Sequence, residues 1–549
     1  MTFRREWLWA VLGSLLGAAA LTWPTLRDPS RTIPADIWDP TLQSWQMAWS
    51  GHSLKTDPGA LWDANAFYPD SYSYAFSDTL LGYVPAGLIG SGPSDAILRY
   101  NIMFVLAHAL ALAGGYFLAR QLGSRVSGAL VVALASASAP WRWAQAGHLH
   151  VLSTGGIALA LAMLARGHGF TLRRGWQPQE ARPGWAVAGW LVAAWQITLG
   201  FGIGLPFAYV LVVLVIAALV LLWRRRRAGF RMPRRLVISD LVGGAAFAVT
   251  TIAMAIPYLK VVEQHPYAER TVTDLRSYSS PIQGFITAPA QSWLWGDLHT
   301  GLRDSMTTPS ETSLLPGFAL YALAIAGLFV SAWPKRKRVV LLAVALGGIV
   351  LSMGTKLLWG AGYLPLYYAL PGWNAIRTPG RLILWTTLAL ALLSAGFVSE
   401  LARRVPRKAA VVLLVPALLV GLEGLQRLDF PVVPAAPPSV VSLRGPALVL
   451  PSSQRLDENI MLWTTGDFPR IVNGGSGFTP RTLEEIRVLA EHFPDAASVD
   501  RLRELGVREV VVLKQYAPGT PYANSLTATG EGLGISRTDR PDAVVFTLS

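Results

Sequence analysis

Eleven stretches of predominantly apolar residues constrain the fold of this chain more than any other feature. A helix of about 20 apolar residues spans a hydrocarbon core of roughly 30 Å. The stretches lie at about 7–26, 97–118, 126–141, 149–166, 185–201, 203–223, 236–258, 314–333, 339–354, 381–401 and 408–425. The sequence therefore predicts a polytopic α-helical membrane protein with eleven or so transmembrane helices. The apolar stretch 79–92 is too short and too broken to span, so we expect it to be re-entrant or interfacial.

The charges between these stretches predict an orientation. With a cytoplasmic N-terminus, the predicted cytoplasmic segments contain 23 Lys and Arg, including Arg224–Arg227 and Lys335–Arg338, but only three acids. Such an excess is typical of the cytoplasmic side. The rest of the chain has more acids than bases. We therefore interpret the net charge of +14 as a signal of membrane orientation, carried by Lys and Arg clusters that contact anionic lipid. We expect an outer C-terminus and no nucleic-acid partner.

Composition along the chain predicts its domains. We expect a transmembrane domain over 1–425 with outer loops at about 27–96 and 259–313, a Pro-rich linker over 426–438, and a small extracytoplasmic α/β domain over 439–549. Strand-like runs in that domain are Ala447–Leu450, Val507–Leu513 and Ala543–Leu548, with a helix-like stretch near Thr482–His492. Gly506 suggests a helix-to-strand turn. Without cysteine, the chain has no disulfide, thiolate metal site or Cys nucleophile.

The first outer loop contains the densest group of candidate functional residues. Asp36 and Asp39 stand close together, and Asp78 follows later in the loop. A carboxylate on a loop beside the membrane can act as a general base toward a hydroxyl group, or bind a cation. The plainer alternative is that these acids cap helices and solvate an outer loop.

Two further groups lie beside predicted spans. Gln145, His148 and His150 follow an aromatic run, and in an extended segment the two His side chains would point to the same side. Two ligands without a third are a weak metal signal, and an interfacial turn with hydrogen-bonded His is the alternative. Arg377 and Arg381 place positive charge on the predicted outer side. They need an anionic partner, which is either a phosphate group or an internal carboxylate.

Glu311 is one such carboxylate, since it lies just before the eighth apolar stretch. Its plainer role is that of an acid in the first turn of a helix, where it complements the helix dipole.

These features together resemble the GT-C superfamily of membrane glycosyltransferases, which have a long first outer loop with an early Asp, many spans and an outer C-terminal domain. Asp39-Pro40 followed by Trp45 and Trp49 is similar to the opening of a bacterial subgroup. Similar later signatures are Phe67-Tyr68-Pro69, Ser77-Asp78, Gln145-Ala146-Gly147-His148, Ala288-Pro289, Glu311, Ile376–Arg381, Val472–Gly477 and Gly506–Val512.

The resemblance implies an enzyme of the bacterial cytoplasmic membrane. It would move a sugar, with inversion, from a polyprenyl-phosphate donor to a glycan, lipid or protein acceptor, in contact with membrane lipids. Asp39 carries over best as the base, with Asp36 as the alternative. The expected substrate-binding residues are Arg377, Arg381, Glu311, His148, Gln145 and Asp78. No cofactor and no metal ligands are firmly implied, although a divalent cation is compatible with this chemistry.

Two other functions remain open at this stage. One is a transporter or flippase of a lipid-linked saccharide, for which His108 and Asp240 are the main ionisable candidates within spans. The other is a non-catalytic membrane scaffold with the same fold.

Overall fold

The structure is a computed structural model that describes residues 3–226 and 232–548. Arg227, at the end of a predicted cytoplasmic Arg run, lies outside the described residues. The chain forms two compact units, each assembled from separate segments. Unit 1 comprises Met1–Trp23, Phe104–Met254 and Glu269–Leu428, and unit 2 comprises Pro24–Met103, Ala255–Ala268 and Asp429–Ser549.

Unit 1 is helical, apart from a two-stranded ribbon of β1 (Phe170–Thr171) and β2 (Gly175–Trp176). Its helices are α1 (Phe3–Leu21), α5 (Val126–Ser138), α6 (Leu149–Leu152), α7 (Gly155–Gly167), α8 (Pro183–Leu199), α9 (Phe201–Arg226), α11 (Val272–Ser277), α12 (Thr300–Asp304), α13 (Pro309–Thr312), α14 (Phe318–Phe329), α15 (Lys335–Ser352), α16 (Leu364–Ala369), α17 (Ile383–Arg404) and α18 (Val415–Glu423). Two long helices, α4 (Gly92–Gln121) and α10 (Arg234–Gln264), contribute residues to both units.

Every predicted apolar stretch coincides with one or more helices of the structure. Within the described residues, five helical segments are long and apolar enough to cross a membrane: Gly92–Gln121, Leu149–Gly167, Phe201–Arg225, Arg234–Gln264 and Pro379–Arg404. The prediction of a mostly helical protein is therefore confirmed, with five helices whose length and composition suit a membrane span. The count of eleven spans stays a prediction.

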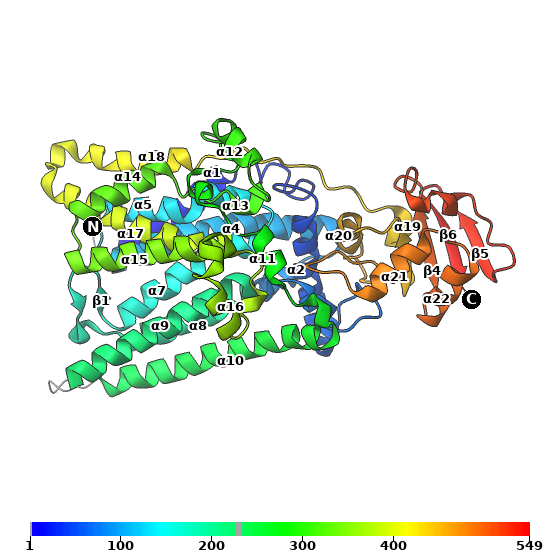
Figure 1. The fold of residues 1–549 in the computed structure, drawn as a ribbon, viewed down its shortest axis with the longest axis horizontal. Helices are drawn as coiled ribbons and strands as arrows, with labels where there is room; N and C mark the ends of the chain where they lie inside the picture. Colours follow the sequence, from blue (N-terminus) through cyan, green and yellow to red (C-terminus); the bar gives the residue numbers. More distant parts are fainter. Residues whose placement is uncertain (1–2, 227–231, 549) are drawn as a thin grey trace. The chain divides into compact units, whose positions relative to one another are not determined.

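Helix α17 lies at the centre of unit 1, where it packs against α5, α14 and α15 (Figure 1). Hydroxyl groups on α17 supply polar links to these neighbours. Thr386 donates to the carbonyl oxygen of Ala345 on α15 at 2.9 Å, and Ser394 to that of Leu320 on α14 at 3.4 Å. Since lipid tails are as apolar as leucine, such links help helices associate in a bilayer.

Unit 2 contains a four-stranded sheet with strand order β3-β4-β6-β5 (Figure 1). Strand β3 (Ala447–Leu450) is parallel to β4 (Glu509–Leu513), while β6 (Ala543–Leu548) is antiparallel to both β4 and β5 (Ile535–Asp539). The helices of the unit, besides parts of α4 and α10, are α2 (Asp39–Thr56), α3 (Val84–Gly87), α19 (Pro438–Val441), α20 (Gln454–Trp463), α21 (Arg481–Ala490) and α22 (Ala496–Glu504). The expected small C-terminal sheet domain is confirmed.

The first loop folds together with the C-terminal segment in unit 2. Trp45 on α2 donates to the side-chain oxygen of Asn65 at 3.0 Å, and the Asn65 amide donates to Thr464 at 3.0 Å. Both tryptophans of the sequence signature, Trp45 and Trp49, are buried in the same apolar core as β3 and β4. The loop is therefore a structured part of this unit, and α2 begins at Asp39.

Candidate functional site

One group of predicted site residues meets in unit 1. Arg381, in the 3-10 helix Pro379–Leu382, pairs with Glu311 of α13 at 2.7 Å between Nη2 and Oε1. Gln145 donates to the other Glu311 oxygen at 2.9 Å. His150 lies 3.4 Å from Arg381 Nη1 through its Nε2 atom. The internal carboxylate that the sequence left open as a partner for Arg381 is thus Glu311.

Neighbouring side chains stabilise the ionised form of Glu311. Burial alone would raise the pKa of this carboxyl group. The positive charge of Arg381, the nearby His148, and hydrogen bonds from Arg381 and Gln145 outweigh burial and lower the pKa of Glu311 below its ordinary value. Glu311 is therefore an ionised, buried carboxylate whose charge is compensated within the unit.

The two histidines do not lie in an extended segment, so that expectation is wrong. Helix α6 begins at Leu149, because the aromatic 3-10 turn Pro140–Gln145 bends the chain and His148 becomes the residue before the helix. The rings of His148 and His150 nevertheless lie edge to face, with centroids 5.7 Å apart. Among residues 3–226 and 232–548, no group of three or more His, Asp or Glu could hold a metal ion.

Arg377 occupies a different environment from Arg381. Its guanidinium group stacks over the ring of Tyr278 at 4.8 Å. Burial lowers the pKa of the neighbouring Arg270, and the positive charge of Arg377 lowers it further. Both guanidinium groups help to lower the pKa of Asp274. The main cause of this lowered pKa is that the Asp274 carboxylate accepts hydrogen bonds from the backbone and side chain of Thr271. Within the part of the chain that the structure describes, Arg377 forms no ion pair.

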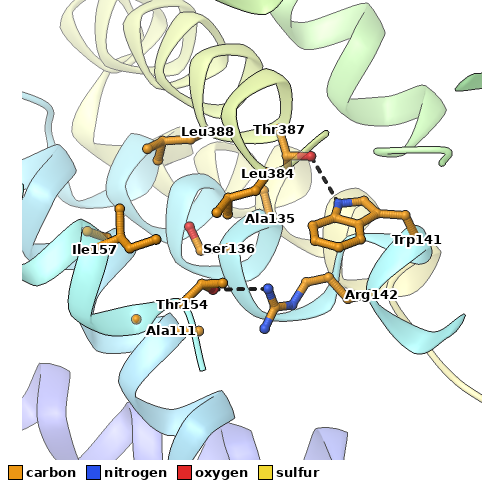
Figure 2. Close-up of a pocket in the computed structure, with 12 residues that line it drawn as sticks. Ala111, Ala135, Ser136, Trp141, Arg142, Thr154, Ile157, Leu384, Thr387 and Leu388 are labelled. Atoms are coloured by element: carbon orange, nitrogen blue, oxygen red, sulfur yellow. Dashed lines mark hydrogen bonds between the residues drawn. The ribbon is translucent and has the colours of Figure 1, made fainter. Parts of the chain in front are cut away.

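Arg142 lies in the same 3-10 turn as Gln145, Pro140–Gln145, and supports that turn. This side chain is 1% exposed, and its three hydrogen bonds go to the carbonyl oxygens of Ala137 and Leu152 and to the Thr154 hydroxyl. Figure 2 shows the guanidinium group directed toward Thr154. The adjoining cavity of about 20 Å³ has room for a water molecule and not for a sugar. Arg142 is therefore a support of the turn rather than a ligand-binding group.

The second group of predicted residues lies in unit 2. Asp36 accepts a hydrogen bond from the backbone of Trp38 at 2.9 Å, and this turn leads directly into Asp39 at the start of α2. Both carboxylates are half-buried. Their charges act on the buried Tyr100 of α4 and on the buried Glu458 of α20. Sequence reasoning missed Tyr100 and Glu458, because nothing in their local sequence distinguishes them from core residues.

Asp78 is placed by its backbone. Gln46 of α2 donates to the carbonyl oxygen of Asp78 at 2.8 Å and to the Ser77 hydroxyl at 2.9 Å. The Tyr258 hydroxyl also donates to the Ser77 carbonyl oxygen at 3.3 Å. The Ser77-Asp78 signature thus marks a fixed turn of the first loop.

Comparison with known proteins identifies the fold. The sequence matches no family model and no curated protein. Over its full length the chain is similar in structure to the arabinofuranosyltransferase AftD from mycobacteria, with TM-scores of 0.51 and 0.50 and identities of 17% and 16% in two structures. The oligosaccharyltransferase AglB from Archaeoglobus fulgidus has a TM-score of 0.47 and 13% identity, over the whole of this chain and 75% of its own.

The likeness to the arabinofuranosyltransferase covers 42% and 41% of that protein in its two structures, so this chain spans less than half of its length. At such low identity the likeness establishes the fold. The fold of the chain is therefore similar to that of an arabinofuranosyltransferase, and membership in the GT-C superfamily stays a prediction.

Proposed function

We propose that this chain is an integral membrane glycosyltransferase that moves a sugar from a polyprenyl-phosphate donor to an extracytoplasmic glycan, lipid or protein acceptor. The GT-C fold supports this general kind of activity. The observation that carries the proposal is the environment of Arg377. Among the residues that the structure describes, Arg377 forms no ion pair, and it lies near Arg270 and Asp274, directly before the long apolar segment Pro379–Arg404.

A lipid phosphate would add a second anion beside these two guanidinium groups, since Asp274 already lies near both. Two guanidinium groups close together repel one another, and an anion between them removes that repulsion. Arginine binds phosphate through two parallel hydrogen bonds. Helix α17, which follows Arg377, is packed inside unit 1, so the contact proposed for Arg377 is with the phosphate group and not with the lipid tail.

In this reaction Asp39 is the general base. It takes the proton of the acceptor hydroxyl while the hydroxyl oxygen bonds to the anomeric carbon of the donor sugar. The bond between that carbon and the phosphate oxygen breaks, and polyprenyl phosphate leaves with the electron pair. A positive charge beside the departing phosphate stabilises the charge that develops on it. Attack opposite the leaving group inverts the anomeric configuration.

The ionisable residues that a transporter would use within its spans have structural partners instead. Asp240 pairs with His168 at 3.0 Å and accepts from the Trp190 indole at 3.2 Å. The His108 ring stacks on Trp143, and its Nδ1 lies 2.9 Å from the carbonyl oxygen of Phe104. These contacts favour transfer chemistry over alternating access for this chain.

The test separates donor binding from chemistry. The purified chain in nanodiscs is titrated with undecaprenyl phosphate and, as a control lipid, undecaprenol. We expect R377A to weaken binding of the phosphate form at least tenfold, with no change for undecaprenol. The control variant R336A, at an exposed Arg of α15, should bind as the wild type does.

The second arm measures transfer from a panel of undecaprenyl-phosphate sugars to membrane extracts. D39N should lower the rate at least about 100-fold while lipid binding is unchanged, because a general base contributes roughly 10²–10⁴-fold to such a step. Full transfer by D39N would overturn the role of Asp39. Equal binding of both lipids by the wild type would overturn the donor class.

A further inference from the structure

One face of helix α20 holds the segment that carries Asp36 and Asp39. The Arg455 guanidinium group lies over the Trp38 ring at 5.2 Å. Asn459 donates from its side-chain amide to the carbonyl oxygen of Ile37 at 2.9 Å. Residues three and four apart share a helix face, so Glu458, next to Asn459 and three residues after Arg455, also faces this segment. The C-terminal part of unit 2 thus fixes the backbone on both sides of Trp38.

Glu458 is an unusual member of this face. Its side chain is 4% exposed, and its Oε2 atom has no hydrogen-bond partner among the described residues. Of the charged groups that act most strongly on it, Asp39, Asp36 and Asp457 are acidic, and the exposed Arg455 is basic. Arg487 pairs with Asp457 at 2.8 Å and so compensates that acid instead. A buried carboxylate in negative surroundings is strongly disfavoured in its ionised form.

A glycine of the Val472–Gly477 signature fixes the place of this side chain. A Cβ atom on Gly475 would lie 2.6 Å from Cγ of Glu458 and would overlap the carbonyl oxygen of Gln454. The chain at Gly475 therefore packs directly against α20. This close approach leaves Glu458 little freedom to turn away from the acidic segment.

We infer that Glu458 keeps its proton at neutral pH and positions the segment of Asp36 and Asp39, so that it adds no negative charge beside these two residues. The role of Asp39 as the base in this inference rests on the proposed function. With Glu458 neutral, α20 can hold the segment without a further repelling charge. Burial, followed by the charges of Asp39 and Asp36, raises the pKa of Glu458 to about 9.

The first test is a pH titration of the carboxylic-acid carbonyl band in the infrared spectrum of the full chain in nanodiscs. The wild-type spectrum minus that of E458Q should show this band at pH 7 and lose it with a midpoint near pH 9. D39N should lower the midpoint, because one of the acting charges is gone. E484Q, at an exposed glutamate of α21, should leave the band unchanged. Absence of the band at pH 7, or no shift in D39N, would overturn the inference.

The second test uses transfer activity. E458A should lower the rate tenfold or more by loosening the segment, and E458Q should restore it to within about twofold, since an amide resembles the neutral acid. The wild-type rate should fall above pH 9, and E458Q should lack this fall. The same alkaline fall in E458Q, or no rescue of E458A, would contradict the positioning role.

The two proposals fail separately. If the wild-type chain transfers no sugar but the infrared band behaves as described, the proposed reaction is wrong and the neutral state of Glu458 stands. If the chain transfers sugar and D39N abolishes transfer, but the transfer rate of E458Q depends on pH in the same way as that of the wild type, the inference about Glu458 is wrong.

Discussion

At the scale of single side chains, Glu311 and Arg381 illustrate how one pattern admits two functions. An arginine on the predicted outer side requires an anion, and the sequence offered both a phosphate and Glu311. The structure pairs Arg381 with Glu311, and Gln145 completes the contact. Binding of substrate by these residues stays a prediction. Arg377, without such a pair, is the better candidate for the phosphate.

Breaking the Glu311 pair should destabilise unit 1. E311Q leaves Arg381 without its carboxylate, and loss of one partner of a buried pair costs roughly 3–5 kcal/mol. Partial exposure of Arg381 places the expected cost near the lower end of that range. The double variant E311Q/R381M should recover part of the lost stability. Thermal unfolding followed by tryptophan fluorescence in detergent measures both, and equal stability of all three proteins would contradict a stabilising pair.

This pair also predicts a pH dependence. Because the folded pKa of Glu311 is lowered, its stabilisation is present above the ordinary glutamate value of roughly 4.3 and is lost as the pH falls through the folded value. The stability difference between wild type and E311Q should therefore be largest near neutral pH and should shrink below about pH 4.

At the scale of elements, Arg142 links the ends of two helices. Its hydrogen bonds reach carbonyl oxygens in the last turns of α5 and α6, where the helix dipoles favour a positive charge. This explains a fully buried arginine whose hydrogen bonds go only to neutral groups.

Replacing Arg142 should therefore cost stability even though it pairs with no acid. R142M leaves two carbonyl groups without a partner, which should lower the free energy of unfolding by roughly 1–3 kcal/mol for each group. R142K should lose less stability than R142M but should still fall below the wild type, because lysine reaches fewer acceptors. R173M, at an exposed arginine of the β1–β2 turn, is the matched control. The unfolding temperature in detergent is the measurement, and an unchanged value in R142M would refute this capping role.

Some elements could be predicted from local sequence and others could not. The runs that became β3, β4 and β6 are apolar and β-branched, and Gly506 has the positive φ of 75° expected of a turn between α22 and β4. Strand β5 carries mostly polar, exposed residues, so no local signal marks it. The need for a glycine at position 475 arises from its close packing against α20. Local sequence around Gly475 does not show this contact. Similarly, Glu458 became a candidate only when tertiary packing placed it beside Asp36 and Asp39.

At the scale of the whole molecule, the helical membrane class followed from the apolar stretches because each must bury or face lipid along its full length. The sequence did not predict which segments of the chain form unit 2. Residues 24–103, 255–268 and 429–549 share one unit, and only contacts such as those of Asn65 reveal it. A pattern read in windows of 20 residues carries no information about such distant partners.

The predicted orientation has a direct test, because the chain contains no cysteine. The single variants E484C and K335C, at exposed positions of α21 and α15, each introduce the only thiol. In intact cells a membrane-impermeant maleimide should label E484C, whereas K335C should react only after the membrane is opened. The reverse pattern would show that the termini are assigned to the wrong sides.

The three-part construction of unit 2 also orders events during synthesis. The segment with Asp36 and Asp39 leaves the ribosome about four hundred residues before α20 (Gln454–Trp463), which holds it in the finished protein. At roughly 5–20 residues per second, this delay lasts from about 20 to about 80 seconds. The nascent chain therefore inserts most of its helices while the proposed base is still unsupported. A chain released early would carry Asp39 in its first outer loop without the helix that positions it, and premature termination should yield inert protein rather than an unregulated transferase.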